Sequence, residues 1–267
     1  MVLADVAMYE AKGRGGDACV SYDPAAGAGG GARATRRGWA TRIRDALDDD
    51  SFVLHYQPIV DLTTGETCQR ETLLRLRDGD ELILPRTFLH TAERFGLARE
   101  VDRWVIHHAL KDGPDERGRA LAINLSGDSV TDPRVPEFIE HELAACGRDP
   151  ASIVFEVAET TAIANMDRAR AFFAQIKGLG CKVALDDFGA GFGSLYYLKY
   201  LPLDLLKIGG EFIRNLPASR TDQILLEAIV TMAHGLGQQT VAEHVQDAST
   251  VEILRRLGVD QAQGYYL

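Results

Sequence analysis

The alternation of strand-like and helix-like segments constrains this fold more than any other feature of the sequence. Eight runs have the length and apolar content of buried strands, at 52–60, 68–76, 120–126, 152–158, 181–187, 204–209, 239–245 and 260–267. Helical apolar periodicity fills most of the gaps, at 86–111, 133–146, 166–179, 218–236 and 247–257. Eight strands alternating with helices over about 230 residues predict an α/β fold of the (β/α)8 TIM-barrel type rather than a β-sandwich.

One short connection modifies this prediction. Only the segment DLTTGET, at 61–67, separates the first two predicted strands. A parallel crossover needs a dozen or more residues, whereas an antiparallel hairpin needs only a few. We therefore expect a TIM-type barrel whose first strand runs antiparallel to the others.

The chain before the barrel is divided by its composition. Residues 24–39 begin with a run of Gly and Ala that lacks apolar periodicity, and they are predicted to form a flexible linker. Residues 1–23 contain a helix-like and a strand-like segment but are too few to bury a core. We interpret them as the C-terminal remnant of a preceding domain, and residues 40–267 as the barrel.

Charge and cysteine content exclude several functions. The 39 acidic residues against 29 Lys and Arg give a net charge of -10, which argues against a surface that binds DNA or RNA. The four cysteines lie far apart without a CxxC pair, as expected for a reducing, cytoplasmic location. No run approaches 18 apolar residues, so no membrane contact is expected from this chain. Upstream segments of a full-length protein could still provide an anchor.

Seven of the eight predicted strands carry a polar residue inside or just after an apolar run. These residues are Glu71, Asn124, Glu156, Asp186, Asp187, Lys207, Glu243 and Gln263. A single such residue usually lies on a solvated face, and an Asp pair before Gly usually belongs to a turn. Their recurrence favours a shared site, because the C-terminal ends of barrel strands meet at one rim.

Five of these side chains are carboxylates, which repel one another unless cations neutralise them. Carboxylate and amide oxygens without a Cys or His cluster favour Mg²⁺ or Mn²⁺ over zinc. Two such ions about 3.5–4 Å apart, bridged by a shared Asp, are a recurring solution for phosphate-ester hydrolysis. The residues thus indicate a metal-dependent barrel enzyme, with phosphate esters as the favoured substrate class, and do not name the substrate.

Seven segments occur in the order and with the spacing of one known family: YQPIVDLTTGE (56–66), ETLLR (71–75), INLS (123–126), FEVAET (155–160), DDFGAGFGSLYYLKYLPLDLLKI (186–208), VAEHV (241–245) and AQGYYL (262–267). Together they resemble the EAL-domain cyclic-di-GMP phosphodiesterases of bacteria. The resemblance spans residues 40–267. The preceding ADVAMYEAKGRGGDACVSY (4–22) resembles the last helix and strand of a GGDEF diguanylate cyclase domain, which implies an upstream GGDEF domain in the full-length protein.

The resemblance implies a role for each matching position. The implied ligands of two Mg²⁺ or Mn²⁺ ions are Glu71, Asn124, Glu156, Asp186, Asp187 and Glu243, with Asp186 bridging both ions. Besides Glu71 and Glu243, the implied catalytic residues are Lys207, which contacts the nucleophilic water or phosphate, and Gln263, which positions the water. The implied substrate contacts are Gln57 and Arg75. Glu159 would anchor the loop after Asp187, through which the family forms homodimers.

The implied function is hydrolysis of cyclic-di-GMP to linear pGpG in bacterial second-messenger signalling. The alternative is a catalytically impaired EAL-type receptor that binds cyclic-di-GMP and acts through a partner protein. A kinase reading of DFG at 187–189 is discounted, because no Gly-rich lid, HRD loop or VAIK lysine accompanies it.

The sequence departs from the family pattern at four positions. Thr72 replaces the usual Ala of the signature, and Gly209 stands where the family commonly has Asp. His244 and Gln246 replace the usual Gly and Glu after Glu243. We expect the His244 side chain to point away from Glu243, because side chains alternate along a strand.

Overall fold

The computed structural model describes residues 31–114, 116, 118–189 and 195–267. The predicted domain remnant at 1–23 and the first part of the predicted linker lie outside these residues.

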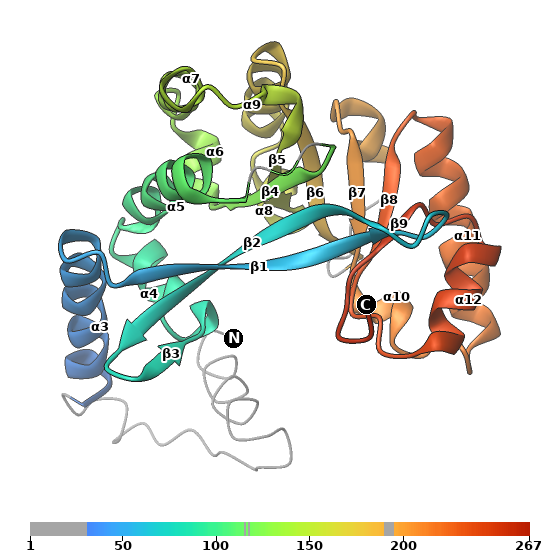
Figure 1. Cartoon of the computed structure of the whole chain (residues 1–267), viewed down its shortest axis with the longest axis horizontal. Coiled ribbons are helices and arrows are strands. Elements are labelled where there is room, and N and C mark those ends of the chain that lie inside the picture. The colour runs from blue at the N-terminus through green and yellow to red at the C-terminus, as the bar shows by residue number, and fades with distance from the viewer. Residues whose placement is uncertain (1–30, 115, 117, 190–194) are drawn as a thin grey trace.

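Within the described residues, eight strands close into a barrel (Figure 1). The barrel strands are β1 (Phe52–Asp61), β2 (Thr67–Asp78), β4 (Ala120–Leu125), β5 (Ile153–Ala158), β6 (Lys182–Phe188), β7 (Leu205–Ile208), β8 (Gln239–Ala242) and β9 (Gln261–Ala262). Neighbours from β2 to β9 pair in parallel, whereas β1 is antiparallel to both β2 and β9. The predicted TIM-type barrel with an antiparallel first strand is therefore confirmed. A short strand, β3 (Glu81–Ile83), extends β2 outside the barrel.

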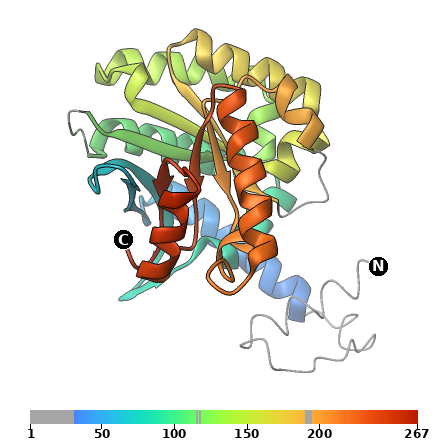
Figure 2. The same cartoon turned by 90° about the vertical axis from the view of Figure 1, so that its right-hand side faces the viewer.

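Helices lie outside the strands, with α11 and α12 on the side of β8 and β9 (Figures 1 and 2). The α-helices are α3 (Gly31–Asp48), α4 (Leu89–Arg94), α5 (Ala98–Asp112), α6 (Gly127–Thr131), α7 (Val135–Cys146), α8 (Glu159–Ala164), α9 (Met166–Gly178), α10 (Gly210–Ile213), α11 (Arg220–Gly235) and α12 (Ala248–Arg256). Short 3₁₀ helices are η1 (Pro85–Thr87), η2 (Pro150–Ser152) and η3 (Leu195–Tyr200). In α5, Val101, Val105 and Ala109 are buried at helical spacing, which directs this face to the core.

The structure corrects the predicted extent of the linker. Helix α3 begins at Gly31, so residues 31–39 of the predicted linker 24–39 are helical. The same helix continues through Ala40, Ile43 and Ala46, which are buried in the core. Packing of this apolar face outweighs the low helix propensity of the glycines at its start.

Other boundaries differ because of local backbone geometry. The predicted helix 86–111 is interrupted after α4, where Gly96 adopts a left-handed conformation (φ 67°) that ends a helix. The predicted final strand, 260–267, pairs only at Gln261 and Ala262.

The apolar core has two parts. The larger part fills the space between the barrel and its helices. The smaller part lies inside the barrel and consists of Ile59, Ala122, Val154, Ala184, Leu205 and Val241. This inner layer separates the two ends of the barrel, so a site at one end is closed from the other.

Candidate active site

Polar side chains from successive strands gather at the C-terminal end of the barrel. Lys207 of β7 lies at the centre of the group and is 1% exposed. Its Nζ lies 2.7 Å from Glu156 Oε2, 2.9 Å from Asp186 Oδ1, 3.1 Å from Glu243 Oε1 and 3.2 Å from Glu71 Oε2. The barrel thus brings four predicted site carboxylates, from β2, β5, β6 and the end of β8, onto one ammonium group.

The charges in this cluster are unbalanced. Burial acts to lower the pKa of Lys207, but the carboxylates raise it well above its ordinary value, so the ammonium stays protonated. Burial raises the pKa of Glu156 well above its ordinary value, against the effect of Lys207. Burial also raises the pKa of Glu243 to about 7, with Lys207 opposing and Asp186 adding to the shift. One lysine therefore does not neutralise the carboxylates that surround it.

Two amides hold Glu71 in place. Asn124 Nδ2 donates to Glu71 Oε1 at 2.7 Å, and Gln263 Nε2 donates to Glu71 Oε2 at 2.8 Å. Burial alone would raise the pKa of Glu71, but Lys207 and these donors keep it below its ordinary value. Glu71 is consequently an ionised carboxylate, and Asn124 and Gln263 both lie in the predicted group.

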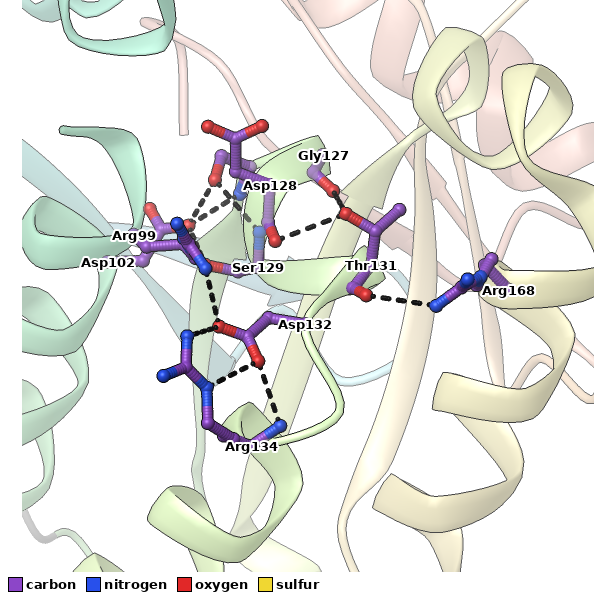
Figure 3. A network of polar contacts seen from close by, with 10 residues as sticks. Arg99, Asp102, Gly127, Asp128, Ser129, Thr131, Asp132, Arg134 and Arg168 are labelled. Atoms are coloured by element: carbon purple, nitrogen blue, oxygen red, sulfur yellow. Dashed lines mark hydrogen bonds and ion pairs between the residues drawn. The ribbon is translucent and has the colours of Figure 1, made fainter. Parts of the chain in front are cut away.

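Asp102 of helix α5 holds the turn that follows Asn124, through a contact that no local sequence pattern predicts. Asp102 Oδ2 accepts hydrogen bonds from Ser126 N (2.9 Å) and Ser126 Oγ (2.5 Å). It also accepts one from Ser129 Oγ (2.6 Å), and Figure 3 labels both Asp102 and Ser129. Burial raises the pKa of Asp102 to about 6, although these hydrogen bonds partly oppose the rise. The contact fixes Ser126, the N-cap of α6, two residues after Asn124.

Asp187 lies at the edge of the cluster. Its backbone is left-handed (φ 54°), and burial followed by the charge of Asp186 raises its pKa. Glu159 Oε2 accepts a hydrogen bond from Gly189 N at 2.9 Å, and its Oε1 accepts one from the Tyr197 hydroxyl. Glu159 therefore contacts both described ends of the loop after Asp187. The dimer contact is expected through this loop as a whole, and its residues 190–194 lie outside the described residues.

The two predicted substrate contacts have different surroundings. Gln57 pairs with Glu71 across the β1–β2 hairpin and lines a cavity of about 220 Å³. The cavity is also lined by Glu71, Leu73, Glu243, His244, Gln246, Gln263, Gly264 and Tyr265. Arg75 is not among these residues, and its Nη1 donates to the carbonyl oxygen of Leu74 at 2.7 Å. The structure brings Gln57 to the site and leaves Arg75 directed at backbone.

The premise for expecting the His244 side chain to point away from Glu243 does not hold. Strand β8 ends at Ala242, and His244 has a left-handed backbone (φ 58°), so strand alternation does not extend to it. His244 lines the same cavity as Glu243. A signal was available, because the family's usual Gly at this position is the residue that most readily adopts positive φ.

The donor set fits divalent cations. It consists of carboxylate and amide oxygens, which suit Mg²⁺ or Mn²⁺, and it carries more negative charge than Lys207 balances. Within the described part of the chain, Gln263 Oε1 is buried without a hydrogen-bond partner, and Asp186 Oδ1 forms an ion pair with Lys207. Among the residues that the structure describes, no three His, Cys, Asp or Glu side chains have the arrangement of a metal site, since the carboxylates converge on Lys207.

A larger cavity, of about 550 Å³, opens at the opposite end of the barrel. It is lined by residues at the starts of strands, such as Ala120, Lys182 and Leu205. The inner apolar layer lies between it and the carboxylates. Size alone therefore does not identify the candidate site, and the chemistry lies at the smaller cavity.

Comparison with known proteins places this chain in a family. The sequence profile of the EAL domain matches residues 40–267. The chain belongs to the EAL domain family. The match includes every residue of the cluster around Lys207.

Relatives of this EAL domain include two named cyclic di-GMP phosphodiesterases. PdeB of Shewanella oneidensis is 36% identical over 233 residues, which are 85% of this chain and 27% of the relative. PdeF of Escherichia coli is 37% identical over 231 residues, which are 85% of this chain and 31% of the relative. The chain therefore spans less than a third of the length of either relative.

Solved structures share the barrel. The PaMucR phosphodiesterase in complex with c-di-GMP is 33% identical, with a TM-score of 0.79, covering 85% of this chain and 95% of that one. In the part of this EAL domain that the structure describes, no helix combines the length and apolarity needed to cross a membrane.

Proposed function

We propose that this EAL domain hydrolyses cyclic-di-GMP to linear pGpG with the help of two Mg²⁺ or Mn²⁺ ions. The observation that carries the proposal is the gathering of Glu71, Glu156, Asp186 and Glu243 around buried Lys207. Buried carboxylates in such excess are costly unless cations accompany them. The naming of relatives as cyclic di-GMP phosphodiesterases supports the choice of substrate.

The ligand set would be the one expected from the family resemblance. The residues that would hold the ions are Glu71, Asn124, Glu156, Asp186, Asp187 and Glu243, with Asp186 shared between the two. Divalent ions bound there supply Lewis acidity and a water of lowered pKa. Asn124 already contacts Glu71, so the amide and the carboxylate would turn toward a common ion together.

Other residues would act on the substrate and the water. Lys207 remains protonated and would stabilise negative charge that develops on the phosphoryl oxygens. Gln263 would orient the attacking water with its Oε1 atom, which accepts no hydrogen bond from the residues that the structure describes. Gln57 would donate to the substrate from the cavity wall, and Arg75 would give a phosphate charge-assisted bonds after leaving the Leu74 carbonyl.

The setting of the domain is also part of the proposal. We infer that it acts in bacterial second-messenger signalling in the cytoplasm, as a homodimer through the loop after Asp187 anchored by Glu159. The resemblance of residues 4–22 supports a GGDEF domain upstream in the full-length protein. The small share of each relative that this chain covers leaves room for such additional domains.

An activity assay tests the proposal directly. Purified protein with Mn²⁺ or Mg²⁺ is incubated with cyclic-di-GMP, and the nucleotides are separated by anion-exchange chromatography. We expect pGpG to accumulate, and Glu71→Gln to stop its formation because a ligand and a charge are lost. Glu66→Gln changes an exposed glutamate in the turn before β2 and should leave the rate unchanged. Failure of the unmodified protein to produce pGpG over hours would contradict the proposal.

The glycine at position 209 favours the alternative function, a receptor that binds cyclic-di-GMP without hydrolysing it. Gly209 lies two residues after Lys207 and lacks the carboxylate that the family commonly has at this position. A Cβ at this position would lie 3.4 Å from Phe188 O and 3.6 Å from Asp187 Oδ1, so a side chain fits. If the protein binds cyclic-di-GMP without hydrolysing it, Gly209→Asp should restore product formation. Gly209 is also the N-cap of α10, a position that Asp suits.

A further inference from the structure

His244 has an unusual backbone conformation beside the candidate active site. Positive φ at non-glycine residues in the described chain occurs at Asp50, Asp187 and His244. Such conformations are unfavourable for side chains with a Cβ and persist where the surroundings enforce them, often at functional sites. Two of these three residues lie at the cluster of carboxylates, and His244 directly follows Glu243.

The imidazole of His244 lies against a position that has room for it. A Cβ on Gly210 would come within 2.6 Å of His244 Cδ2 and 3.0 Å of its Cγ. Any side chain at residue 210 would therefore displace the ring. Gly210, at the start of α10, has no side chain. The His244 ring, which follows β8, can therefore lie against the segment that follows β7.

The ring nitrogens of His244 are available to a ligand. The side chain is exposed, and within the described part of the chain no hydrogen bond or ion pair engages it. The buried Nζ of Lys207, by contrast, is surrounded by four carboxylates. His244 therefore offers an uncommitted N–H donor on the wall of a cavity that is otherwise rich in acceptors.

We propose that His244 is a substrate-binding residue whose imidazole N–H donates a hydrogen bond to a phosphate oxygen of the cyclic dinucleotide. The left-handed backbone of His244 and the missing side chain at Gly210 leave room for the ring in this position. This inference rests on the proposed function, because it names a further contact to the same substrate. The oxygens of a phosphodiester group accept hydrogen bonds and donate none, so the free N–H of His244 is a suitable partner for them.

The first test replaces the ring without straining the backbone. Glycine adopts φ near 58° freely, so His244→Gly should keep or raise the melting temperature. Its Kd for cyclic-di-GMP, measured by calorimetry in EDTA to prevent turnover, should rise about tenfold or more, the cost of one hydrogen bond to a charged group. His244→Asn keeps an N–H donor and tolerates left-handed backbone, so it should recover part of the affinity. His141→Ala removes an exposed imidazole on α7, away from the cavity, and should not change the Kd.

The second test uses the neighbour. Gly210→Ala places a methyl group where the ring lies, so it should weaken binding by a similar factor. In the double variant His244→Gly, Gly210→Ala, no further loss is expected, because the ring that the methyl displaces is already absent. Losses that simply add would overturn the inference.

Three other results would also decide the matter. Unchanged affinity in His244→Gly overturns the inference while leaving the proposed function intact. A fall in melting temperature together with the loss of affinity assigns His244 a structural role, and a parallel loss of Mn²⁺ affinity assigns it to the metal; both overturn the inference. If the unmodified protein neither binds nor hydrolyses cyclic-di-GMP, the proposed function fails first, and this contact fails with it.

Discussion

Asp102 should make the stability of this domain depend on pH between 5.5 and 7.5. Burial raises its pKa to about 6 from an ordinary value of 3.8. The folded chain therefore binds this proton more tightly than the unfolded chain does. The contribution of protonated Asp102 to the free energy of unfolding is fully present below pH 3.8 and is lost as the pH rises through about 6.

The size of the effect follows from these two pKa values. A rise from 3.8 to about 6 corresponds to about 3 kcal/mol over the full titration, since one pKa unit is worth about 1.4 kcal/mol. Between pH 5.5 and 7.5, the linkage relation assigns to Asp102 a loss of about 0.8 kcal/mol. Asp102→Asn is the matching perturbation, because Asn resembles the protonated acid in shape and does not titrate.

The assay is chemical denaturation of the unmodified protein and Asp102→Asn at both pH values. The free energy of unfolding of the unmodified protein, relative to the variant, should fall by about 0.8 kcal/mol on going from pH 5.5 to 7.5. A relative stability that is the same at both pH values would refute the reasoning, because it would mean that Asp102 keeps one protonation state throughout.

Asp132 provides a matched control in the same network (Figure 3). Its carboxylate accepts hydrogen bonds from Arg134 Nε (3.0 Å), Arg134 Nη2 (2.7 Å) and Arg99 Nη1 (2.8 Å). Hydrogen bonds from Arg134 hold the pKa of Asp132 below its ordinary value, so it is ionised above pH 5.5 in both folded and unfolded chains. Asp132→Asn should lower stability by the same amount at both pH values.

Three further changes probe the site and the core. Lys207→Met leaves the buried carboxylates without their ammonium group, so the free energy of unfolding measured in EDTA should fall by about 3–5 kcal/mol. Millimolar Mn²⁺ should recover part of this loss. A variant that is as stable as the unmodified protein in EDTA would contradict the prediction. Tyr197→Phe removes a donor to Glu159 and should cost about 1–3 kcal/mol, as measured by urea denaturation. Phe155→Ala, at a fully buried position, should cost about 3–5 kcal/mol, whereas Phe95→Ala, at a position 42% exposed, should cost much less in the same measurement.

The barrel and its polar rim could be predicted because both follow from local patterns. Strand and helix periodicity gave the element order, and the short segment after Asp61 required an antiparallel pair. Residues such as Asn124 and Glu156 stood out because they interrupt apolar runs near strand ends, and in the structure they are neighbours across β4 and β5.

What could not be predicted depends on contacts between distant segments or on backbone geometry. Asp102 accepts hydrogen bonds from Ser126 because α5 packs beside the turn after β4, and no local sequence pattern predicts that contact. The convergence of carboxylates on Lys207 depends on side-chain directions that barrel closure sets. Strand alternation does not apply to His244, because β8 ends two residues earlier and the backbone there is left-handed.

The pairing of β1 with β9, which closes the barrel, has a consequence for folding during synthesis of the chain. Strand β1 forms a long hairpin with β2 but meets β9 only at Val60–Ala262 and Asp61–Gln261. These partners are about 200 residues apart, so at a synthesis rate of about 5–20 residues per second the first strand waits roughly 10–40 s for its second neighbour. Until then, one edge of the hairpin is open to pairing with other chains. Pairing of β1 with β9 is the most non-local contact of the barrel, so ring closure is expected late in its folding.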